Sequence, residues 1–203
     1  MKGCRPLSGQ EVSEVIGSIF GTFAGRDKAL VILGTKSGFR ISELLSLRIG
    51  DIIQAGQLVD KVTVRRAKMK KKIEGRTVLL HPEAKSALVA WIDELRALGY
   101  MDADSYVFQS RKGANKSISR VQAYRIINGA AAEAGLTGRI GTHTMRKTFA
   151  NNVYRRLLER RAAGEAIDPF RLTSKALGHK NINSTDSYLS FMEADIDDAV
   201  LAS

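Results

Sequence analysis

The chain is poor in cysteine, histidine and proline, and it has no long apolar run. Its 203 residues include one cysteine, three histidines and three prolines. A single cysteine excludes an intrachain disulfide and a cysteine-based zinc site, and the histidines lack metal-ligand spacing. No apolar stretch approaches the ~20 residues of a membrane-spanning helix. The first seven residues lack the apolar core of a signal peptide, so we expect a cytoplasmic protein.

What the chain has in excess is positive charge. Lysine and arginine number 32 against 21 acidic residues, which gives a net charge of +11 and an isoelectric point near 9.9. A phosphate polymer is the commonest partner for such a surface, and a basic protein without a nucleic acid partner is the alternative. Apolar residues make up 44% of the chain, enough to form a core in one large domain or two small ones.

Periodicity and capping residues predict a mainly α fold with a small antiparallel β-sheet. Ser8 and Glu11 form a capping box that opens the first helix. The β-branched segment at 58–66 and the segment at 77–80 predict a hairpin with a basic tip. Tyr106 to Phe108 is a further short strand candidate. The other helices are expected over about 27–36, 42–47, 82–98, 119–134, 142–160 and 168–177, with a last one around residue 188.

A set of basic residues ends in one tyrosine. Arg40 lies in Ser-Gly-Phe-Arg-Ile-Ser-Glu, His143 and Arg146 form His-Thr-Met-Arg, and His179 closes Leu-Gly-His. Tyr188 follows nine residues later. Guanidinium and imidazole groups can surround a phosphate with hydrogen-bond donors, and a tyrosine hydroxyl at its edge can attack it. These residue types therefore fit covalent cleavage of a DNA strand.

Position supports some members of this set more than others. His143 and Arg146 are three residues apart, so they share a helix face near a helix start, where an anion is favoured. A lone histidine is more often a buried, hydrogen-bonded one. Arg40 lies in a turn between packed helices, and a surface ion pair is the alternative for it.

All the motifs, in this order, resemble the catalytic domain of the tyrosine recombinase (phage integrase) family. The resemblance extends from about Leu7 to Phe191. It implies that Arg40 and Arg146 hold the non-bridging phosphate oxygens, that His143 manages the proton of the tyrosine, and that His179 positions the phosphate. Tyr188 would be the nucleophile that forms a 3′-phosphotyrosine. No cofactor or metal is implied, because the cationic side chains supply the electrostatic stabilisation.

The resemblance also implies a lysine on the hairpin that protonates the departing 5′ oxygen. Lys68 is the first choice, because it lies two residues beyond the strand that ends at Arg66, and Lys70 is the second choice. The other basic residues here and in the loop at 110–116 need only a DNA backbone to explain them. The expected DNA-contacting residues are Arg65, Arg66, Lys70, Lys71, Lys72, Arg76, Arg111 and Lys112.

The expected organisation is a single catalytic domain over 1–203, with a lead-in at 1–7 and a tail helix at 189–203. The N-terminal core-binding domain of typical relatives is absent, so the chain is either a fragment or a short form similar to the stand-alone invertases of fimbrial switches, bacterial or phage-encoded. The partner is double-stranded DNA. The acidic, amphipathic tail would dock on a neighbouring protomer, giving a monomer in isolation and a homotetramer on paired sites; a cap on its own body is the alternative.

Two other functions use similar residues. A type IB topoisomerase-like enzyme has the same catalytic groups but rejoins the same strand and relaxes DNA as a monomer. A DNA-binding regulator without catalysis would lack one of the catalytic residues, and none is missing here. The favoured function is therefore site-specific recombination, in which DNA is integrated, excised or inverted.

Overall fold

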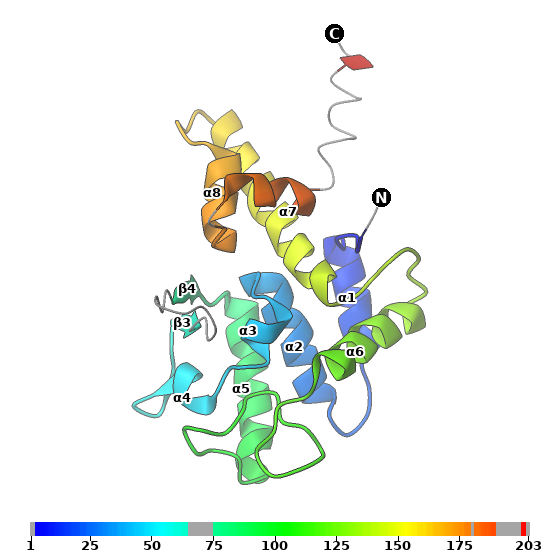
Figure 1. Ribbon diagram of the computed structural model, residues 1–203, viewed down its shortest axis with the longest axis vertical. Helices are drawn as coiled ribbons and strands as arrows, with labels where there is room; N and C mark the ends of the chain where they lie inside the picture. The colour runs from blue at the N-terminus through cyan, green and yellow to red at the C-terminus, as the bar shows by residue number, and fades with distance from the viewer. Residues whose placement is uncertain (1–2, 65–74, 180, 190–199, 202–203) are drawn as a thin grey trace.

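The computed structural model of the protein describes residues 3–64, 75–179, 181–189 and 200–201 (Figure 1). It is mainly helical with two small antiparallel strand pairs, which confirms the predicted fold class. The elements are α1 (Gly9–Gly17), α2 (Ala24–Ser37), α3 (Ile41–Leu44), α4 (Ile49–Ile52), β1 (Ile53–Gln54), β2 (Gln57–Leu58), β3 (Lys61–Val64), β4 (Arg76–Leu79), α5 (Pro82–Ala97), α6 (Arg120–Glu133), α7 (Thr142–Ala162), α8 (Pro169–Leu177) and the 3-10 helix η1 (Ile182–Tyr188).

Capping residues define most helix ends as expected. Ser8 accepts from the backbone N–H of Glu11 at 3.1 Å, and the Glu11 carboxylate accepts from the backbone N–H of Ser8 at 2.8 Å. Helices α2 and α8 both end in left-handed glycines, Gly38 at φ +60° and Gly178 at φ +65°. A Cβ at position 38 would lie 2.2 Å from the ring of Phe149, so this turn needs glycine for space as well as for conformation.

The sheet differs in detail from the prediction. Strands β3 and β4 pair antiparallel from Lys61–Leu79 to Val64–Arg76, as the hairpin prediction requires. The first strand starts at residue 61 because residues 53–58 form a separate hairpin, β1–β2, which was not predicted. Helix α4 was also not predicted, since four residues are too few for a periodic signal. The candidate strand at 106–108 makes only an isolated bridge, Tyr106 to Arg48.

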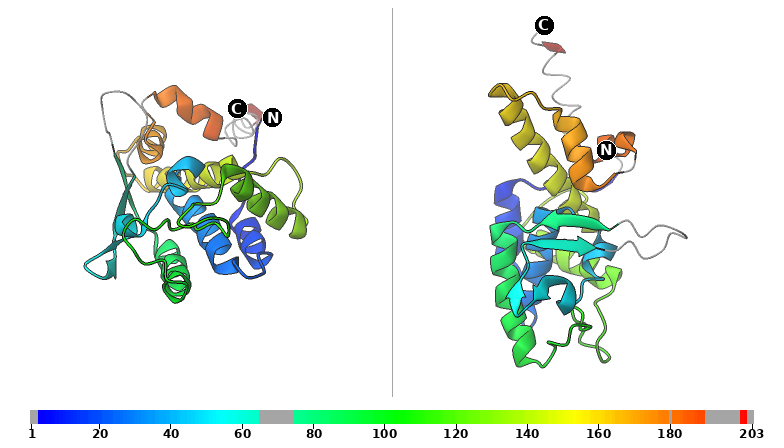
Figure 2. Two further views of the ribbon diagram at one scale, coloured as in Figure 1. Left: turned by 60° about the horizontal axis from the view of Figure 1, so that its bottom comes forward. Right: turned by 90° about the vertical axis from the view of Figure 1, so that its left-hand side faces the viewer.

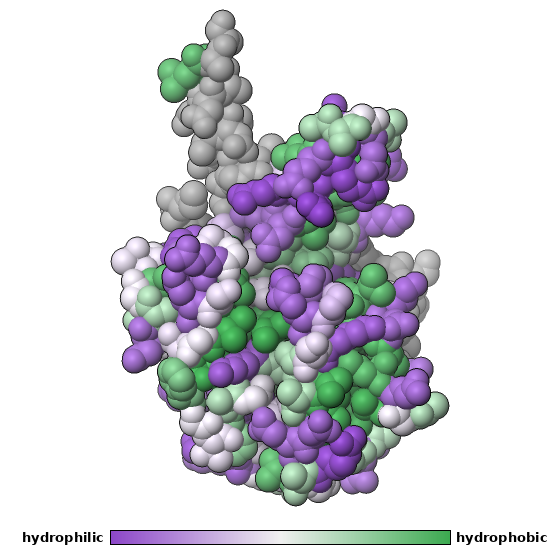
Figure 3. Space-filling model, turned by 180° about the vertical axis from the view of Figure 1, so that it is seen from behind, coloured by the Kyte–Doolittle hydropathy of each residue, from purple (hydrophilic) through white to green (hydrophobic). Residues whose placement is uncertain are grey.

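Among the residues that the structure describes, two apolar clusters form the interior. The first, here called the main core, joins α1 to α6 with the start of α7 and contains Trp91, which is 1% exposed. The second is small: Ala150, Leu177 and Leu189 with partly buried neighbours. It belongs to the C-terminal layer, defined as the described residues from Ala150 to Leu189, which include α8 and η1. This layer protrudes from the main body (Figures 1 and 2), and seen from behind its surface is largely hydrophilic below a paler tip (Figure 3).

In the described part of the chain, no helix is both long and apolar enough to cross a membrane. The predicted tail helix at 189–203 falls almost wholly outside the described residues, so its docking stays a prediction.

Candidate active site

Arg146 is the buried centre of the candidate site. It lies in the second turn of α7 and is 1% exposed. Nη1 donates to the carbonyl of Gly38, and Nη2 donates to the carbonyl of Leu177 at 2.8 Å. Burial lowers the pKa of Arg146 and the charge of Arg40 lowers it further, whereas Tyr188 and Glu43 raise it. A guanidinium remains charged under such a shift, so the site keeps a fixed positive charge.

His179 and Tyr188 meet at this arginine. The Nε2 atom of His179 lies 3.0 Å from Nη2 of Arg146, and its Nδ1 atom lies 3.0 Å from Oγ1 of Thr185. The imidazole is tilted by 48° against the ring of Tyr188, with 5.1 Å between centroids. The Cζ atom of Arg146 lies 5.3 Å from the centroid of the Tyr188 ring. Three predicted residues from three elements, α7, the end of α8 and η1, therefore share one site.

Arg40 presents its charge from the turn between α2 and α3. The adjacent Phe39 is 1% exposed and anchors that turn in the main core. The Glu43 carboxylate accepts from the backbone N–H of Arg40 at 2.7 Å and from Nη1 at 3.1 Å. The side chain of Arg40 is nevertheless 38% exposed, so it can reach a ligand from outside. Arg146 donates to the carbonyl of Gly38, two residues before Arg40, so the turn that carries Arg40 adjoins Arg146. The charge of Arg40 accordingly lowers the pKa of Arg146.

His143 is exposed in the first turn of α7, three residues before the buried Arg146. Among the described residues, no hydrogen bond joins its ring to Arg146, His179 or Tyr188. The role expected for His143 therefore stays a prediction. Lys68 and Lys70, the two candidates for the general acid, lie outside the described residues, as do Arg65, Arg66, Lys71 and Lys72.

Arg76 does not fit the predicted DNA contact. It opens β4 and is 9% exposed, because its guanidinium turns inward over the ring of Phe39 at 5.3 Å. Nη1 donates to the carbonyl of Gly38 at 3.0 Å, and Nη2 donates to those of Ser37, at 2.9 Å, and Ala176. The bonds join the hairpin to the end of α2 and to the end of α8. A basic run in a sequence cannot show which of its members turns inward.

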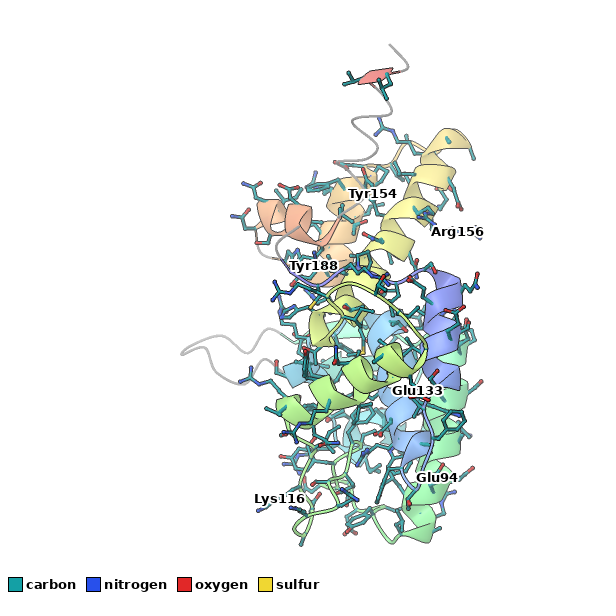
Figure 4. All side chains as sticks on the ribbon, turned by 90° about the vertical axis from the view of Figure 1, so that its right-hand side faces the viewer. Glu94, Lys116, Glu133, Tyr154, Arg156 and Tyr188 are labelled. Carbon is teal, nitrogen blue, oxygen red and sulfur yellow. The ribbon has the colours of Figure 1, made fainter. Side chains whose placement is uncertain are left out.

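Arg111 and Lys112 are exposed, as a DNA contact requires. They lie in the loop between Gln109 and Ser117, which pair as an isolated bridge. Lys116 of the same loop lies toward the opposite end of the molecule from Tyr188 (Figure 4). Any DNA contact made there is therefore distant from the tyrosine.

Sequence reasoning missed Thr185. The segment Asn183-Ser184-Thr185 was interpreted only as the start of the last helix. The structure buries Thr185 completely and turns its hydroxyl toward His179. The only signal in the sequence is its position three residues before Tyr188, which puts it within reach of the site on a tight helix.

Several known proteins are similar to this chain. The family model described as the phage integrase family matches residues 7–194. The probable integrase/recombinase YoeC of Bacillus subtilis is 37% identical over 131 residues, which cover 64% of each protein. The type 1 fimbriae regulatory protein FimE of Escherichia coli K12 is 32% identical over 189 residues, covering 91% of this chain and 84% of FimE.

Among solved structures, the XerH site-specific recombinase bound to a palindromic difH substrate in a post-cleavage complex superposes with a TM-score of 0.71. The match is 22% identical and covers 97% of this chain but 52% of XerH, so it establishes the fold. The chain spans less than two thirds of YoeC and about half of XerH. The family model, the relatives and the fold agree: this chain belongs to the phage integrase family of tyrosine recombinases.

Proposed function

We propose that this chain is a site-specific recombinase that cleaves and rejoins DNA through a 3′-phosphotyrosine intermediate. The observation that carries the proposal is the convergence of Arg146, His179 and Tyr188, with 3.0 Å between the first two side chains and 5.1 Å between the two rings. Membership in a family of recombinases supports it.

Each side chain has a role in the proposed cleavage. The Tyr188 oxygen attacks the phosphorus, its proton passes to a base for which His143 is the candidate, and a tyrosyl–phosphate bond forms at the 3′ side. The bond to the 5′ oxygen breaks, and Lys68 supplies the proton that this oxygen needs. Arg40 and Arg146 stabilise the charge on the non-bridging oxygens during the transfer.

Rejoining reverses these roles. A 5′ hydroxyl attacks the phosphotyrosine, the tyrosine oxygen leaves and regains its proton, and the DNA backbone is restored. When the attacking hydroxyl belongs to another duplex, the result is strand exchange. The bond energy is conserved in the phosphotyrosine, so no nucleotide hydrolysis is needed.

Double-stranded DNA is the proposed partner. The net charge of +11 supports it, as do structures of relatives bound to DNA, including XerH on difH and the Tn1549 transposon integrase on a transposon end. We further propose a cytoplasmic location, because the substrate is found there. The protein would be a monomer in isolation and a tetramer on paired sites, linked by the tail at 189–203.

The test is capture of the covalent intermediate. The full chain is incubated with a library of nicked duplexes of random sequence, in which a short fragment is lost after cleavage and traps the adduct. Denaturation with detergent, recovery of protein-bound DNA and sequencing should return one enriched site joined to Tyr188. Absence of adduct with the wild-type chain in such a library would contradict the proposal. Relaxation of supercoiled plasmids that lack the enriched site would favour a topoisomerase.

A further inference from the structure

Thr185 is a buried hydroxyl at the edge of the candidate site. It lies in η1 three residues before Tyr188 and is 0% exposed. Its Oγ1 lies 3.0 Å from Nδ1 of His179, whose Nε2 lies 3.0 Å from Nη2 of Arg146. The imidazole is therefore held at both nitrogens, by a hydroxyl on one side and by a guanidinium on the other.

The chemistry of these groups decides where the ring proton lies. A guanidinium nitrogen can only donate, so Nε2 of His179 accepts from Arg146 through its lone pair. The proton of the neutral ring then lies on Nδ1 and is donated to Thr185. This tautomer has no N–H at Nε2, which is the nitrogen on the side of Arg146. A phosphate held by Arg146 would need a donor at that nitrogen.

We propose that Thr185 is a positioning residue that holds His179 and permits its change of tautomer when a phosphate binds. A hydroxyl both accepts and donates, so Thr185 can accept from Nδ1–H and, after rotation about the Cβ–Oγ1 bond, can donate to a bare Nδ1. His179 is only partly buried, so Nδ1 can release its proton to solvent while Nε2 takes one up from solvent and turns it toward the phosphate. Thr185 then donates to Nδ1, which keeps a hydrogen-bond partner. The proposal rests on the proposed recombinase function.

The same contact couples the tyrosine to the histidine. Thr185 and Tyr188 belong to one turn of η1, and the ring of Tyr188 packs on the imidazole. The hydrogen bond from Nδ1–H of His179 to Thr185 thus fixes the distance between the proposed nucleophile and the proposed phosphate-binding group. Thr185 would act through His179 and not touch the reacting atoms.

The experiment compares two substitutions with a matched control. Thr185→Val removes the hydroxyl and nearly keeps the volume, and Thr185→Ser keeps the hydroxyl. Thr173→Val is the control, because Thr173 is also 0% exposed in the C-terminal layer but donates to the carbonyl of Pro169 at 2.8 Å, away from His179. The first measurement is ¹⁵N NMR of the His179 ring in each full-length protein without DNA, which distinguishes the tautomers and needs no activity.

The expected results separate positioning from stability. In the wild type and Thr185→Ser the ring should carry its proton on Nδ1. In Thr185→Val the Nδ1–H loses its acceptor, so the Nδ1 signal should shift and the tautomer protonated at Nε2 should gain population. Single-turnover cleavage of the duplex enriched from the library should fall about tenfold to a hundredfold in Thr185→Val, with Kd changed less than about twofold. Thr185→Ser should restore the rate, and Thr173→Val should cleave like the wild type.

Two results would overturn the proposal. One is an unchanged His179 ring signal in Thr185→Val. The other is a loss of cleavage in Thr173→Val as large as in Thr185→Val, which would reduce Thr185 to a packing residue. If the wild-type chain forms no adduct at all, the proposed function fails, while the NMR comparison still tests the contact between Thr185 and His179.

Discussion

The main core and the C-terminal layer are built differently. The main core is a continuous apolar cluster that extends from Leu7 to Met145, whereas the cluster of the C-terminal layer consists of Ala150, Leu177 and Leu189. Apolar burial at roughly 25 cal/mol per Å² can hold the first but gives little to the second. Two buried guanidiniums, of Arg76 and Arg146, supply further attachment by bonds to the carbonyls at the end of α8.

Two of the residues proposed to act in catalysis therefore lie in the region with the smaller apolar cluster. Arg40 belongs to a turn anchored in the main core, while His179 and Tyr188 belong to the C-terminal layer. The site exists only when the layer is attached. Arg146, for which we propose a catalytic role, also contributes to that attachment, because its donors reach Gly38 on one side and Leu177 on the other.

The largest expected effect is complete loss of DNA cleavage by a protein that still folds. Tyr188→Phe removes only the attacking oxygen, so the protein should bind DNA with unchanged Kd and form no covalent adduct on denaturing gels. Tyr154→Phe is the control, since Tyr154 packs against the same small cluster. An adduct from Tyr188→Phe would show that another residue is the nucleophile.

The next largest effects are expected for Arg40 and Arg146, which should differ in their contribution to thermal stability. Loss of a transition-state donor typically costs about 3–4 kcal/mol, so Arg40→Ala and Arg146→Ala should each slow single-turnover cleavage by two to three orders of magnitude. Only Arg146→Ala should also lower Tm, because Arg146 is buried and bonded to two backbone carbonyls, while the Arg40 side chain is 38% exposed. Equal losses of Tm would mean that both arginines attach the layer.

Two leucines test how separate the regions are. Leu30 and Leu177 are both 0% exposed, the first in the main core and the second in the C-terminal layer. Leu30→Ala should cost about 2–5 kcal/mol of global stability. Leu177→Ala should mainly increase hydrogen exchange in α8 and η1, with the amides of α2 and α5 little changed. Equal loss of protection in α2 would show that the clusters unfold as one unit.

The smallest expected effect is a change in the salt dependence of DNA binding. It should distinguish three lysines that we expect to contact DNA from Arg76, which is buried. Replacing Lys70, Lys71 and Lys72 with alanine should reduce the slope of log Kd against log salt by up to about 2.7, if each contacts one phosphate. Arg76→Met should leave that slope unchanged and instead lower Tm, because its guanidinium is bonded to carbonyls inside the protein. A flatter slope for Arg76→Met would restore it as a DNA contact.

The sequence was sufficient for most of the fold because helix ends carry local chemical signals. Ser8, Gly38, Pro169 and Gly178 lie at the ends where they were expected. The short elements α4, β1 and β2 were missed because two to four residues give no period, and long-range packing decides them.

The residues of the candidate site were predictable in part from the order of the motifs along the chain. Motif order identified Arg40, Arg146, His179 and Tyr188, which the structure brings together, while their catalytic roles and that of His143 remain predictions. The inward turn of Arg76 and the contact of the Thr185 hydroxyl were not predictable. The first depends on carbonyls of distant elements, as far away as Ala176, and the second depends on how η1 folds back on His179. Local pattern cannot supply such contacts.

The length of α7 has a mechanical consequence. The helix is continuous over 21 residues, with its base in the main core and its tip beyond the small cluster. At about 1.5 Å per residue the tip lies about 24 Å past Arg146, so a tilt of about 5° at the base displaces it by about 2 Å. A small tilt of α7 about its base, near the candidate active site, therefore moves the turn between α7 and α8 by a larger distance. A domain fused at this turn would transmit force through α7 and α8 to His179. A domain fused in the loop at 110–116 would transmit force only to the main core.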